Sequence, residues 1–346
     1  MICAPTDLTG NGRPDVIVGG NEDEPRIYWY ENLDDGWERH DLASGRPICP
    51  GAALGDLTGN GRLDLVVGGP WNGHEAVWFE QPEDPRDSWP EHGLCNDFNK
   101  YHDQGFADVD DDGEPEVVLV SQNAEVVCYY DVPDDPRDGW WPRENRTFVA
   151  AGVGDAEGIQ VLDVDGDGRS ELVVGRRIFH RQDADGTEWE AQRVAPDWED
   201  ERVRVVGADL DGEPKLVLAE CELPSLGARH DIYHDGRLGI CEGPDWDDPT
   251  VLRDDLHCPH SLQVADLDGD GRPDIYVAES DFGGHDNPRH FVYRNLGDGE
   301  YEEHLIHEGT ATHQAKTVDL TGDGRLDIVG KNDTDDPHVD VWYNET

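Results

Sequence analysis

The side chains best suited to chemistry are carboxylates spaced through short turns that contain glycine. In the segment Asp266–Asp274, oxygen-bearing side chains occupy positions 1, 3, 5 and 9, and glycine occupies position 6. Carboxylates in this spacing can converge on one hard cation, and the glycine allows a sharp bend between them. Without a cation the like charges would repel one another, and calcium suits a ligand set made only of oxygen. This segment therefore predicts a calcium-binding loop.

Versions of this turn recur along the whole chain. The six sets predicted to bind calcium, giving about six sites, are Asp7, Thr9, Asn11 and Asp15; Asp56, Thr58, Asn60 and Asp64; Asp108, Asp110, Asp112 and Glu116; Asp163, Asp165, Asp167 and Glu171; Asp266, Asp268, Asp270 and Asp274; and Asp319, Thr321, Asp323 and Asp327. A seventh copy, Asp209–Lys215, is two residues shorter and ends in lysine, so we expect no calcium there. Ordinary turns in an acidic protein are the alternative, and six copies in register argue against it.

A second group of candidates lies six residues before the turns. His102, Glu157, His260 and His313 share this position. Six residues of strand span about 20 Å, so we expect this group at the opposite end of the strands from the acidic turns. Histidines beside a carboxylate suit zinc, manganese or iron, which would polarise a carbonyl or activate water. The alternatives are a histidine acting as a base and histidines that simply bond to backbone carbonyls.

Further polar residues extend this candidate site. Three residues before the turns come Gln160, Gln263 and Lys316, and the ends of the following apolar runs add Glu220, Glu279 and Lys331. The chain has only four lysines, and three of them, Lys100, Lys316 and Lys331, map near this end of the strands. In a chain so poor in lysine, this placement indicates a functional surface.

These side chains need a repeated scaffold of short strands to position them. The first aspartates of successive turns are 46 to 57 residues apart, and a period near 50 is typical of propellers or solenoids. An apolar, β-branched run such as Ile275–Val277 follows each turn, and an aromatic run such as Ile27–Tyr30 comes next. Four strands in each of seven units predict an all-β, seven-bladed β-propeller.

The whole chain is predicted to be one propeller domain, 1–346. Its blades are expected at about 1–44, 46–97, 99–152, 155–195, 199–255, 257–307 and 310–346. The first strand of each blade carries small residues and is expected to be innermost, which puts the histidine group at the rim of the central channel. Polar insertions at 223–234 and 280–290 are expected on one face. Met1 falls almost on an inner strand, so the closing strand of blade seven either lies upstream or is absent.

The acidic turns resemble the FG-GAP/VCBS repeats of calcium-binding propellers, which are known from integrin α-subunits and many microbial proteins. The resemblance rests on the D-x-D-G-D-G motif and extends over essentially all 346 residues. It implies the propeller fold and bound calcium, and it says little about function, because one fold carries many functions.

The segments around the histidines resemble, more narrowly, propellers related to the N-terminal domain of aldos-2-ulose dehydratase and to polysaccharide lyases. The matching segments are His257–Leu262, Ala278–Glu279, Thr312–Gln314 and Gly330–Lys331. The resemblance implies β-elimination on a sugar, with a metal or basic side chains stabilising an enolate-like intermediate. It makes His260 and His313 metal ligands or bases and Lys316 or Lys331 an oxyanion stabiliser, and Glu279 completes the catalytic candidates. The chain lacks the second domain of the dehydratase and carries Glu157 in the histidine group.

The composition limits partners and compartment. The formal charge is −52, from 79 acidic and 27 basic residues. Such dispersed acidity resembles proteins of halophilic archaea, whose surface repulsion is relieved when molar salt shortens the Debye length to about 3 Å. It argues against nucleic acid and anionic membranes as partners. Seven cysteines without framework spacing, no long apolar run and no signal-peptide pattern predict a cytoplasmic protein, or an extracellular one if the true start lies upstream of Met1.

Two functions compete on this reading. The first is a carbohydrate-directed carbon–oxygen lyase or dehydratase at the channel mouth, acting on a sugar or oligosaccharide, and it requires the three histidines to converge. The second is a non-catalytic propeller that binds glycans or proteins, and it predicts exposed aromatic platforms without such convergence. A purely structural calcium propeller is a third reading. The grouping of Glu279, Lys316 and Lys331 with histidines of the last two blades favours the lyase.

Overall fold

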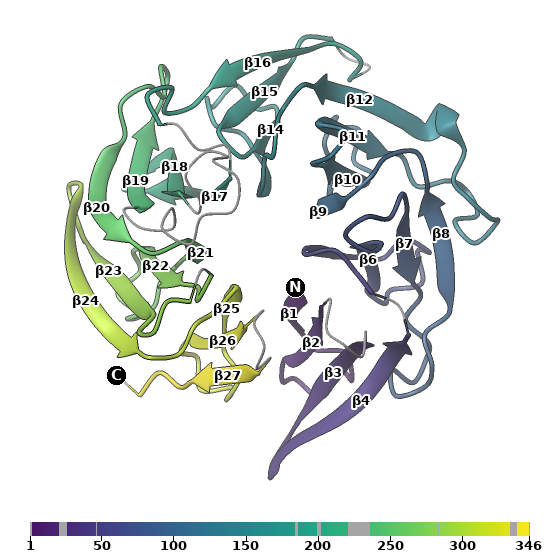
Figure 1. Ribbon diagram of the computed structural model, residues 1–346, viewed down its shortest axis with the longest axis horizontal. Helices are drawn as coiled ribbons and strands as arrows, with labels where there is room; N and C mark the ends of the chain where they lie inside the picture. The colour runs from purple at the N-terminus through teal and green to yellow at the C-terminus, as the bar shows by residue number, and fades with distance from the viewer. Residues whose placement is uncertain are drawn as a thin grey trace. The chain divides into compact units, whose positions relative to one another are not determined.

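The computed structural model describes residues 2–20, 26–45, 47–183, 186–198, 202–220, 236–282, 284–332 and 338–345. Within these ranges the regular structure is β-strand, apart from one short 3-10 helix, η1 (Arg143–Asn145). The strands form seven antiparallel sheets that follow one another in chain order (Figure 1). The all-β, seven-bladed propeller predicted from the sequence is therefore confirmed.

The bounds of the strands follow the chain. Sheets one to three contain β1 (Ile2–Thr6), β2 (Asp15–Gly19), β3 (Arg26–Leu33) and β4 (Gly36–Ser44); β5 (Ala52–Gly55), β6 (Asp64–Gly68), β7 (Ala76–Phe79) and β8 (Glu91–Cys95); and β9 (Tyr101–Ala107), β10 (Glu116–Ser121), β11 (Val126–Tyr130) and β12 (Arg146–Ala151). Sheets four and five contain β13 (Ile159–Leu162), β14 (Glu171–Val174), β15 (Arg177–Arg181) and β16 (Trp189–Arg193); and β17 (Val203–Leu210), β18 (Glu213–Glu220), β19 (Gly236–Glu242) and β20 (Thr250–Leu256). Sheets six and seven contain β21 (Pro259–Ala265), β22 (Asp274–Glu279), β23 (Arg289–Gly297) and β24 (Glu300–Glu308); and β25 (Gln314–Val318), β26 (Asp327–Lys331) and β27 (Val339–Trp342).

In six of the blades, an acidic turn connects the first strand to the second. Ala265 pairs with Asp274 and Ala107 pairs with Glu116, so residue 9 of each turn opens the second strand. The second strands are buried on both faces, which explains why they read as continuous apolar runs. In β6, for example, Val66 packs in the core with β10 residues, whereas Leu65 and Val67 pack in the core with β2 and β3 residues.

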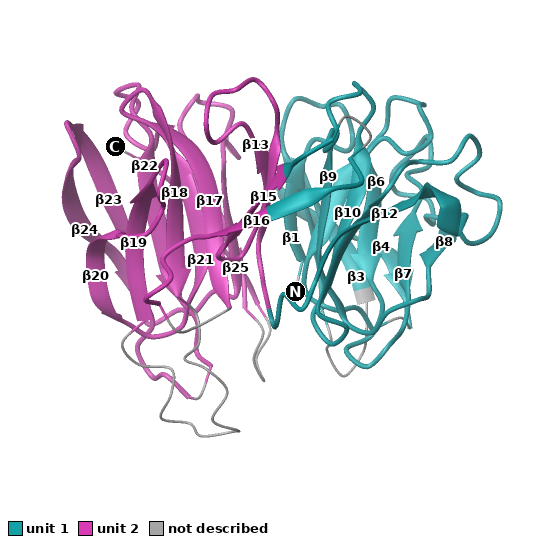
Figure 2. Ribbon diagram, turned by 90° about the horizontal axis from the view of Figure 1, so that it is seen from above, with its two compact units in different colours: residues 1–155, 181–190 teal, residues 156–180, 191–346 magenta. Residues whose placement is uncertain are grey.

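The chain divides into two compact units, coloured separately in Figure 2. Unit 1 comprises residues 1–155 and 181–190, and unit 2 comprises residues 156–180 and 191–346. Within unit 1, β5 lies beside β9, and within unit 2, β21 lies beside β17 and β25, so first strands of successive blades are neighbours. The single-domain boundaries and the central channel stay predictions. The expected insertion at 223–234 lies outside the described residues.

Candidate functional site

The acidic turn between β9 and β10 brings four carboxylates together. One oxygen from each of Asp108, Asp110, Asp112 and Glu116 lies within 4.8 Å of the others. Backbone N–H groups orient the first carboxylate, since Asp112 donates to Asp108 Oδ1 at 3.1 Å and Gly113 donates to Oδ2 at 3.0 Å. Four convergent carboxylate oxygens on a tight loop supply part of the roughly six to eight oxygen ligands that a calcium ion takes.

The other turns share this local geometry. Three-carboxylate groups form in two of them, from Asp163, Asp165 and Asp167 and from Asp266, Asp268 and Asp274. In all six full-length turns the first aspartate accepts a hydrogen bond from the N–H of position 6, donated by Gly12, Gly61, Gly113, Gly168, Gly271 and Gly324. Gly271 has φ +90°, a left-handed conformation that favours glycine. The loops therefore have the bend expected of them, and bound calcium stays a prediction.

Blade five replaces the loop with a tight hairpin. β17 and β18 stay paired up to Leu210 and Glu213, so Asp211 and Gly212 form a two-residue turn in which both have positive φ. The lysine at the end of this short copy, Lys215, donates to Glu242 Oε1 on β19 at 2.7 Å. The acidic loop is therefore lost because the strands continue through it.

The carboxylate at position 9 has a structural role that its spacing alone did not reveal. Asp274 is buried; its Oδ2 accepts the N–H of Leu267 at 3.0 Å and its Oδ1 accepts the N–H of Asn295 at 2.8 Å. The same two bonds recur at Asp15, Asp64 and Asp327. In these four turns the side chain therefore ties the turn to a residue within two positions of the end of the third strand.

Burial also perturbs these carboxylates. Desolvation raises the pKa of Asp64 to about 6 and that of Glu116 to about 8, although backbone N–H donors act in the opposite direction. A nearby cation favours the ionised form of a carboxylate and would counter this effect. Each such turn thus holds a buried acid whose charge bound calcium would stabilise.

His180 joins the turn of blade four, and the spacing of the motif did not point to it. Its Nδ1 lies 3.6 Å from Glu171 Oε1 and 3.9 Å from Asp165 Oδ2. His180 belongs to β15, and only the pairing of β14 with β15 brings it to the loop. Among the carboxylate groups of the acidic turns found in the described residues, the group of blade four is thus the one that includes a nitrogen ligand.

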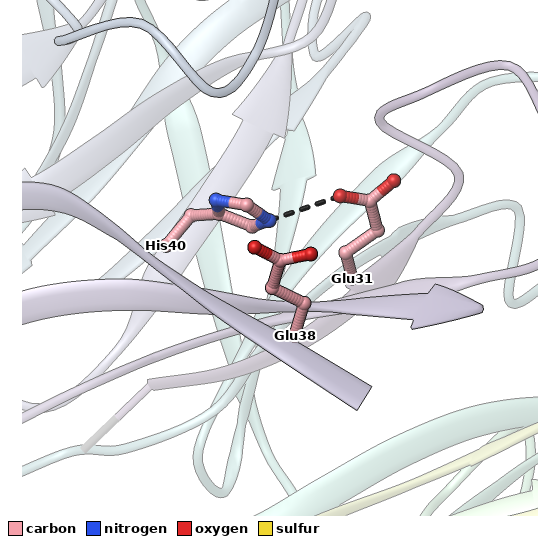
Figure 3. A group of neighbouring side chains, drawn as sticks. All are labelled: Glu31, Glu38 and His40. Atoms are coloured by element: carbon pink, nitrogen blue, oxygen red, sulfur yellow. Dashed lines mark hydrogen bonds and ion pairs between the residues drawn. The ribbon is translucent and has the colours of Figure 1, made fainter. Parts of the chain in front are cut away.

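A further group, Glu31, Glu38 and His40, has metal-like spacing but belongs to a structural contact (Figure 3). His40 Nε2 lies 2.9 Å from Glu31 Oε2, and the His40 ring packs on Trp29 with centroids 4.5 Å apart. Arg86, from the next blade, donates to both Glu31 oxygens. The Arg86 bond lowers the pKa of Glu31 even though the carboxylate is buried.

The same contact occurs again one blade further on. His92 stacks on Trp78 with centroids 4.4 Å apart, and its Nε2 lies 3.4 Å from Glu80 Oε2. Arg137 then donates to both Glu80 oxygens at 2.7 and 2.8 Å. Both arginines lie in the same Asp-Pro-Arg-Asp sequence. We therefore interpret this contact among Trp, His, Glu and Arg as a structural interaction that repeats between neighbouring blades.

In unit 2, the expected histidine group is brought together with an arginine. The rings of His260 and His313 lie 3.8 Å apart, and His260 Nε2 lies 3.8 Å from Glu157 Oε2. Arg204 lies between Glu157 and His260, and its Nη2 is 3.1 Å from Glu157 Oε2 and 2.9 Å from His260 Nε2. His102 belongs to unit 1 and is described separately below.

This arrangement disfavours a transition metal at His260. Its Nδ1 lies 2.8 Å from the carbonyl of His313, which can only accept a hydrogen bond, and Arg204 Nη2 lies 2.8 Å from Nδ1 and 2.9 Å from Nε2. A permanent cation therefore already stands between the histidine and the carboxylate that a metal would have to bridge. The sequence reasoning missed Arg204, because it lies one residue away from the counted position.

The remaining catalytic candidates are used in internal bonding. Glu279 is fully buried and accepts the backbone N–H groups of His257 and Arg289, both at 2.8 Å, and the Arg289 guanidinium. Burial acts to raise the pKa of Glu279, but these donors outweigh it and leave that pKa lowered. The Lys331 ammonium is also buried and donates to the carbonyl of Asn332 at 2.8 Å. Lys316 is half-buried on β25.

In unit 1, His102 lies beside an exposed tryptophan that the motifs did not indicate. The Lys100 Nζ sits 3.7 Å from the centre of the Trp71 ring, and the His102 ring meets Trp71 edge-on at 6.2 Å. His102 Nδ1 lies 3.0 Å from Asp103 Oδ2, and Trp71 is 44% exposed. Lys100 has φ +56°, and its N–H donates to the carbonyl of Gly73 in the loop that carries Trp71.

Comparison with known families supports the repeat interpretation. A family model described as an FG-GAP-like repeat matches residues 7–67 and 266–330, which contain four of the acidic turns and parts of the first, second, sixth and seventh blades. The search of curated proteins found no match. In the described part of the chain, no helix is long and apolar enough to cross a membrane. The chain is a seven-bladed β-propeller that carries FG-GAP-like repeats.

Proposed function

We propose that the protein is a calcium-binding propeller that holds carbohydrate at the surface around Trp71, without converting it chemically. The observation that carries this proposal is the grouping of an exposed indole, the Lys100 ammonium and the His102–Asp103 pair on adjoining segments of blades two and three. We expected such an exposed aromatic platform for a binding module.

The chemistry of this group fits a polyhydroxylated ring. An indole offers a large, rigid apolar face, against which the C–H face of a sugar can pack. Lys100 supplies hydrogen-bond donors beside the indole, and the hydroxyl oxygens of a sugar accept such bonds. His102 and Asp103 are buried, 3% and 8% exposed, and pair with each other, so their role in this proposal is to position the segment that carries Lys100. Lys100 is held in a left-handed backbone conformation, which is uncommon for lysine and is typical of functional segments.

Calcium has a supporting role in this proposal. The first strand of blade three, β9, carries His102 near one end and leads into the Asp108 turn at the other. An ion bound by Asp108, Asp110, Asp112 and Glu116 would stabilise the folded blade, because a ligand that binds only the folded state adds to its stability. The proposal does not place calcium in contact with the sugar.

Titration calorimetry with neutral and uronic-acid oligosaccharides tests the proposal. Trp71→Ala is expected to abolish binding, and Lys100→Met to weaken it. Trp140→Ala is the matched control, because Trp140 is 45% exposed, also lies in unit 1 and has its ring over Gly93 of β8. Equal losses in the two tryptophan variants, or no binding by the wild-type protein to any oligosaccharide, would overturn the proposal.

The lyase expected from the sequence is the second candidate, and the Glu157–Arg204–His260 contact is the observation that favours it. A buried carboxylate, a guanidinium and an imidazole in contact are components of acid–base sites. Ultraviolet absorbance of an unsaturated sugar product would detect elimination. Turnover that His260→Gln abolishes while the melting temperature is retained would establish the lyase in place of simple binding.

A further inference from the structure

The third strand of blade four brings a histidine to the acidic turn, at a place where the other blades bring other side chains. His180 follows Phe179, which pairs with Leu172, so it stands opposite Glu171 at position 9 of the turn. The residues in the same place beside the other five full-length turns are carboxylates, an arginine and a tyrosine: Glu31, Glu80, Asp131, Arg294 and Tyr343. Blade four is therefore the turn at which an imidazole nitrogen can reach a cation held by the loop.

The carboxylate of Glu171 directs one of its oxygens at this histidine. Glu171 is 3% exposed, and its Oε2 accepts the N–H of Val164 at 2.9 Å, which anchors the side chain to the turn. Its Oε1 lies 3.6 Å from His180 Nδ1 and accepts no hydrogen bond from the described residues. In the four turns that end in aspartate, the corresponding oxygen accepts a backbone N–H instead. A buried carboxylate oxygen without a donor is costly, and a cation would satisfy it.

The orientation of the His180 ring is fixed from its other side by Gln192. The Gln192 side-chain amide donates to the carbonyl of Pro244 at 2.8 Å, so its Oε1 is the atom that faces His180 Nε2, at 3.1 Å. Because an amide oxygen only accepts, Nε2 carries the proton of this bond. In the neutral ring Nδ1 then carries the lone pair, and it faces Glu171 Oε1 and Asp165 Oδ2. Metal-binding histidines are held in this way, through a bond from the second ring nitrogen.

The distances within this group suit a small cation between the side chains. His180 Nδ1 lies 3.6 Å from Glu171 Oε1 and 3.9 Å from Asp165 Oδ2, both beyond the range of about 2.7–3.2 Å for a hydrogen bond. Around a tetrahedral zinc ion with ligands at about 2.0–2.2 Å, neighbouring ligand atoms are about 3.3–3.6 Å apart. The Asp165 side chain is 43% exposed, so an ion can enter from solvent and keep a water molecule as a further ligand.

The grouping of the carboxylates also differs from that of an all-oxygen calcium loop. In blade three, Glu116 converges with all three aspartates of its loop, whereas in blade four the glutamate converges with Asp165 and His180. The three aspartates of blade four form a second group that shares Asp165. Calcium takes oxygen ligands, whereas imidazole suits zinc, copper, iron and nickel. A transition metal held by the nitrogen-containing group takes the place of calcium in this turn, so each carboxylate serves one ion.

We propose that Asp165, Glu171 and His180 form a binding site for a first-row transition-metal dication such as zinc, and that the turn of blade four takes this ion in preference to calcium. The three ligands come from the turn, from the start of β14 and from β15, so the ion joins these segments. All three residues belong to unit 2. Because the ion binds the folded arrangement, it stabilises that unit when zinc is present.

Titration calorimetry with zinc tests this on the full chain, in a buffer that holds excess calcium. The wild-type protein is expected to bind one zinc ion tightly, and His180→Gln to bind it at least about tenfold more weakly. His304→Gln is the matched control, because His304 also lies in unit 2 beside a carboxylate, with Nε2 3.2 Å from Glu302 Oε2, and it should bind zinc as the wild type does. Gln192→Leu keeps all three ligands and should weaken binding about tenfold or more, because the ring loses its orienting bond.

Cobalt(II) gives a second readout that does not depend on a variant. Its visible absorption on the wild-type protein should be that of a site with few ligands and nitrogen among them, and a spectrum typical of six oxygen ligands would overturn the proposal. No zinc binding by the wild type in calcium would show that the turn does not prefer zinc. Equal zinc affinities of the wild type and His180→Gln, or equal losses in His180→Gln and His304→Gln, would remove His180 as a ligand.

Discussion

Replacing Asp274 by alanine should destabilise the protein whether or not calcium is present. The buried carboxylate accepts the backbone N–H groups of Leu267 and Asn295, and alanine leaves both donors without these bonds. A buried donor without its partner costs about 1–3 kcal/mol, so two donors predict a loss of about 2–6 kcal/mol in the free energy of unfolding. We therefore expect the effect to exceed that of most surface substitutions.

A second variant separates the structural role from metal binding. Asp268 belongs to the same carboxylate group but is partly exposed. It forms an ion pair with Arg294, and its Oδ1 accepts the N–H of Asp270 at 3.0 Å, a bond that an asparagine oxygen can also accept. Asp268→Asn should change the stability in chelator by only about 0–1 kcal/mol, as expected for a surface ion pair. In calcium it should lose part of the stabilisation that the ion gives the wild-type protein, because one ligand charge is removed.

Urea unfolding monitored by tryptophan fluorescence, with chelator and with calcium at constant ionic strength, measures both effects. Asp274→Ala should shift the midpoint strongly in both buffers, whereas Asp268→Asn should shift it mainly in calcium. If Asp274→Ala in chelator stays within about 0.5 kcal/mol of the wild type, the assignment of two stabilising backbone bonds to this side chain is refuted.

Three other perturbations follow from the structure. Burial lowers the pKa of His290 to about 4, so its contribution to stability is complete above pH 6.5 and is lost as the pH falls to about 4. The loss amounts to about 3 kcal/mol, at about 1.4 kcal/mol per pH unit. Urea unfolding at several pH values should show that the free energy of unfolding depends less on pH in His290→Gln, and an unchanged dependence would contradict the assignment. Arg86→Met and Arg137→Met should each destabilise the protein by about 1–3 kcal/mol, because each leaves a largely buried carboxylate without its cation. Zinc should leave the melting temperature of His180→Gln, which lacks the proposed zinc ligand of blade four, unchanged, and a higher melting temperature of this variant in zinc would favour a metal at Glu31. Metal analysis after purification in high salt should find calcium at about six ions per chain, and chelation should lower the melting temperature; a melting temperature indifferent to both chelator and salt would remove the calcium assignment.

The acidic turns could be predicted because all their parts lie within nine residues of chain. Asp266 and Gly271 need no distant partner to form the bend, since the Gly271 N–H bonds back to the Asp266 side chain. The apolar runs that follow are buried on both faces, so their composition alone indicated strands. The period of these features then predicted the seven blades.

The role of the histidine group could not be predicted in the same way. Counting back from the turns correctly placed His260 beside His313, but it could not show that Arg204 lies between His260 and Glu157. A glutamate such as Glu279 could act as an acid or base, and only the structure shows that its carboxylate is paired with the Arg289 guanidinium. A side chain's partners come from neighbouring strands and blades, and linear spacing carries no record of them.

The sequence by itself determined the repeat, the strand type and the local shape of each acidic turn, because these depend on chain-local spacing, on glycine and on the burial pattern. Only the tertiary structure decided which charges meet across strands. It placed Lys100 over Trp71, His180 beside Glu171 and Arg204 against His260, and it left β27 without a fourth strand beside it in the described chain. Each of these contacts depends on the distance between segments that are far apart along the chain, and packing sets that distance.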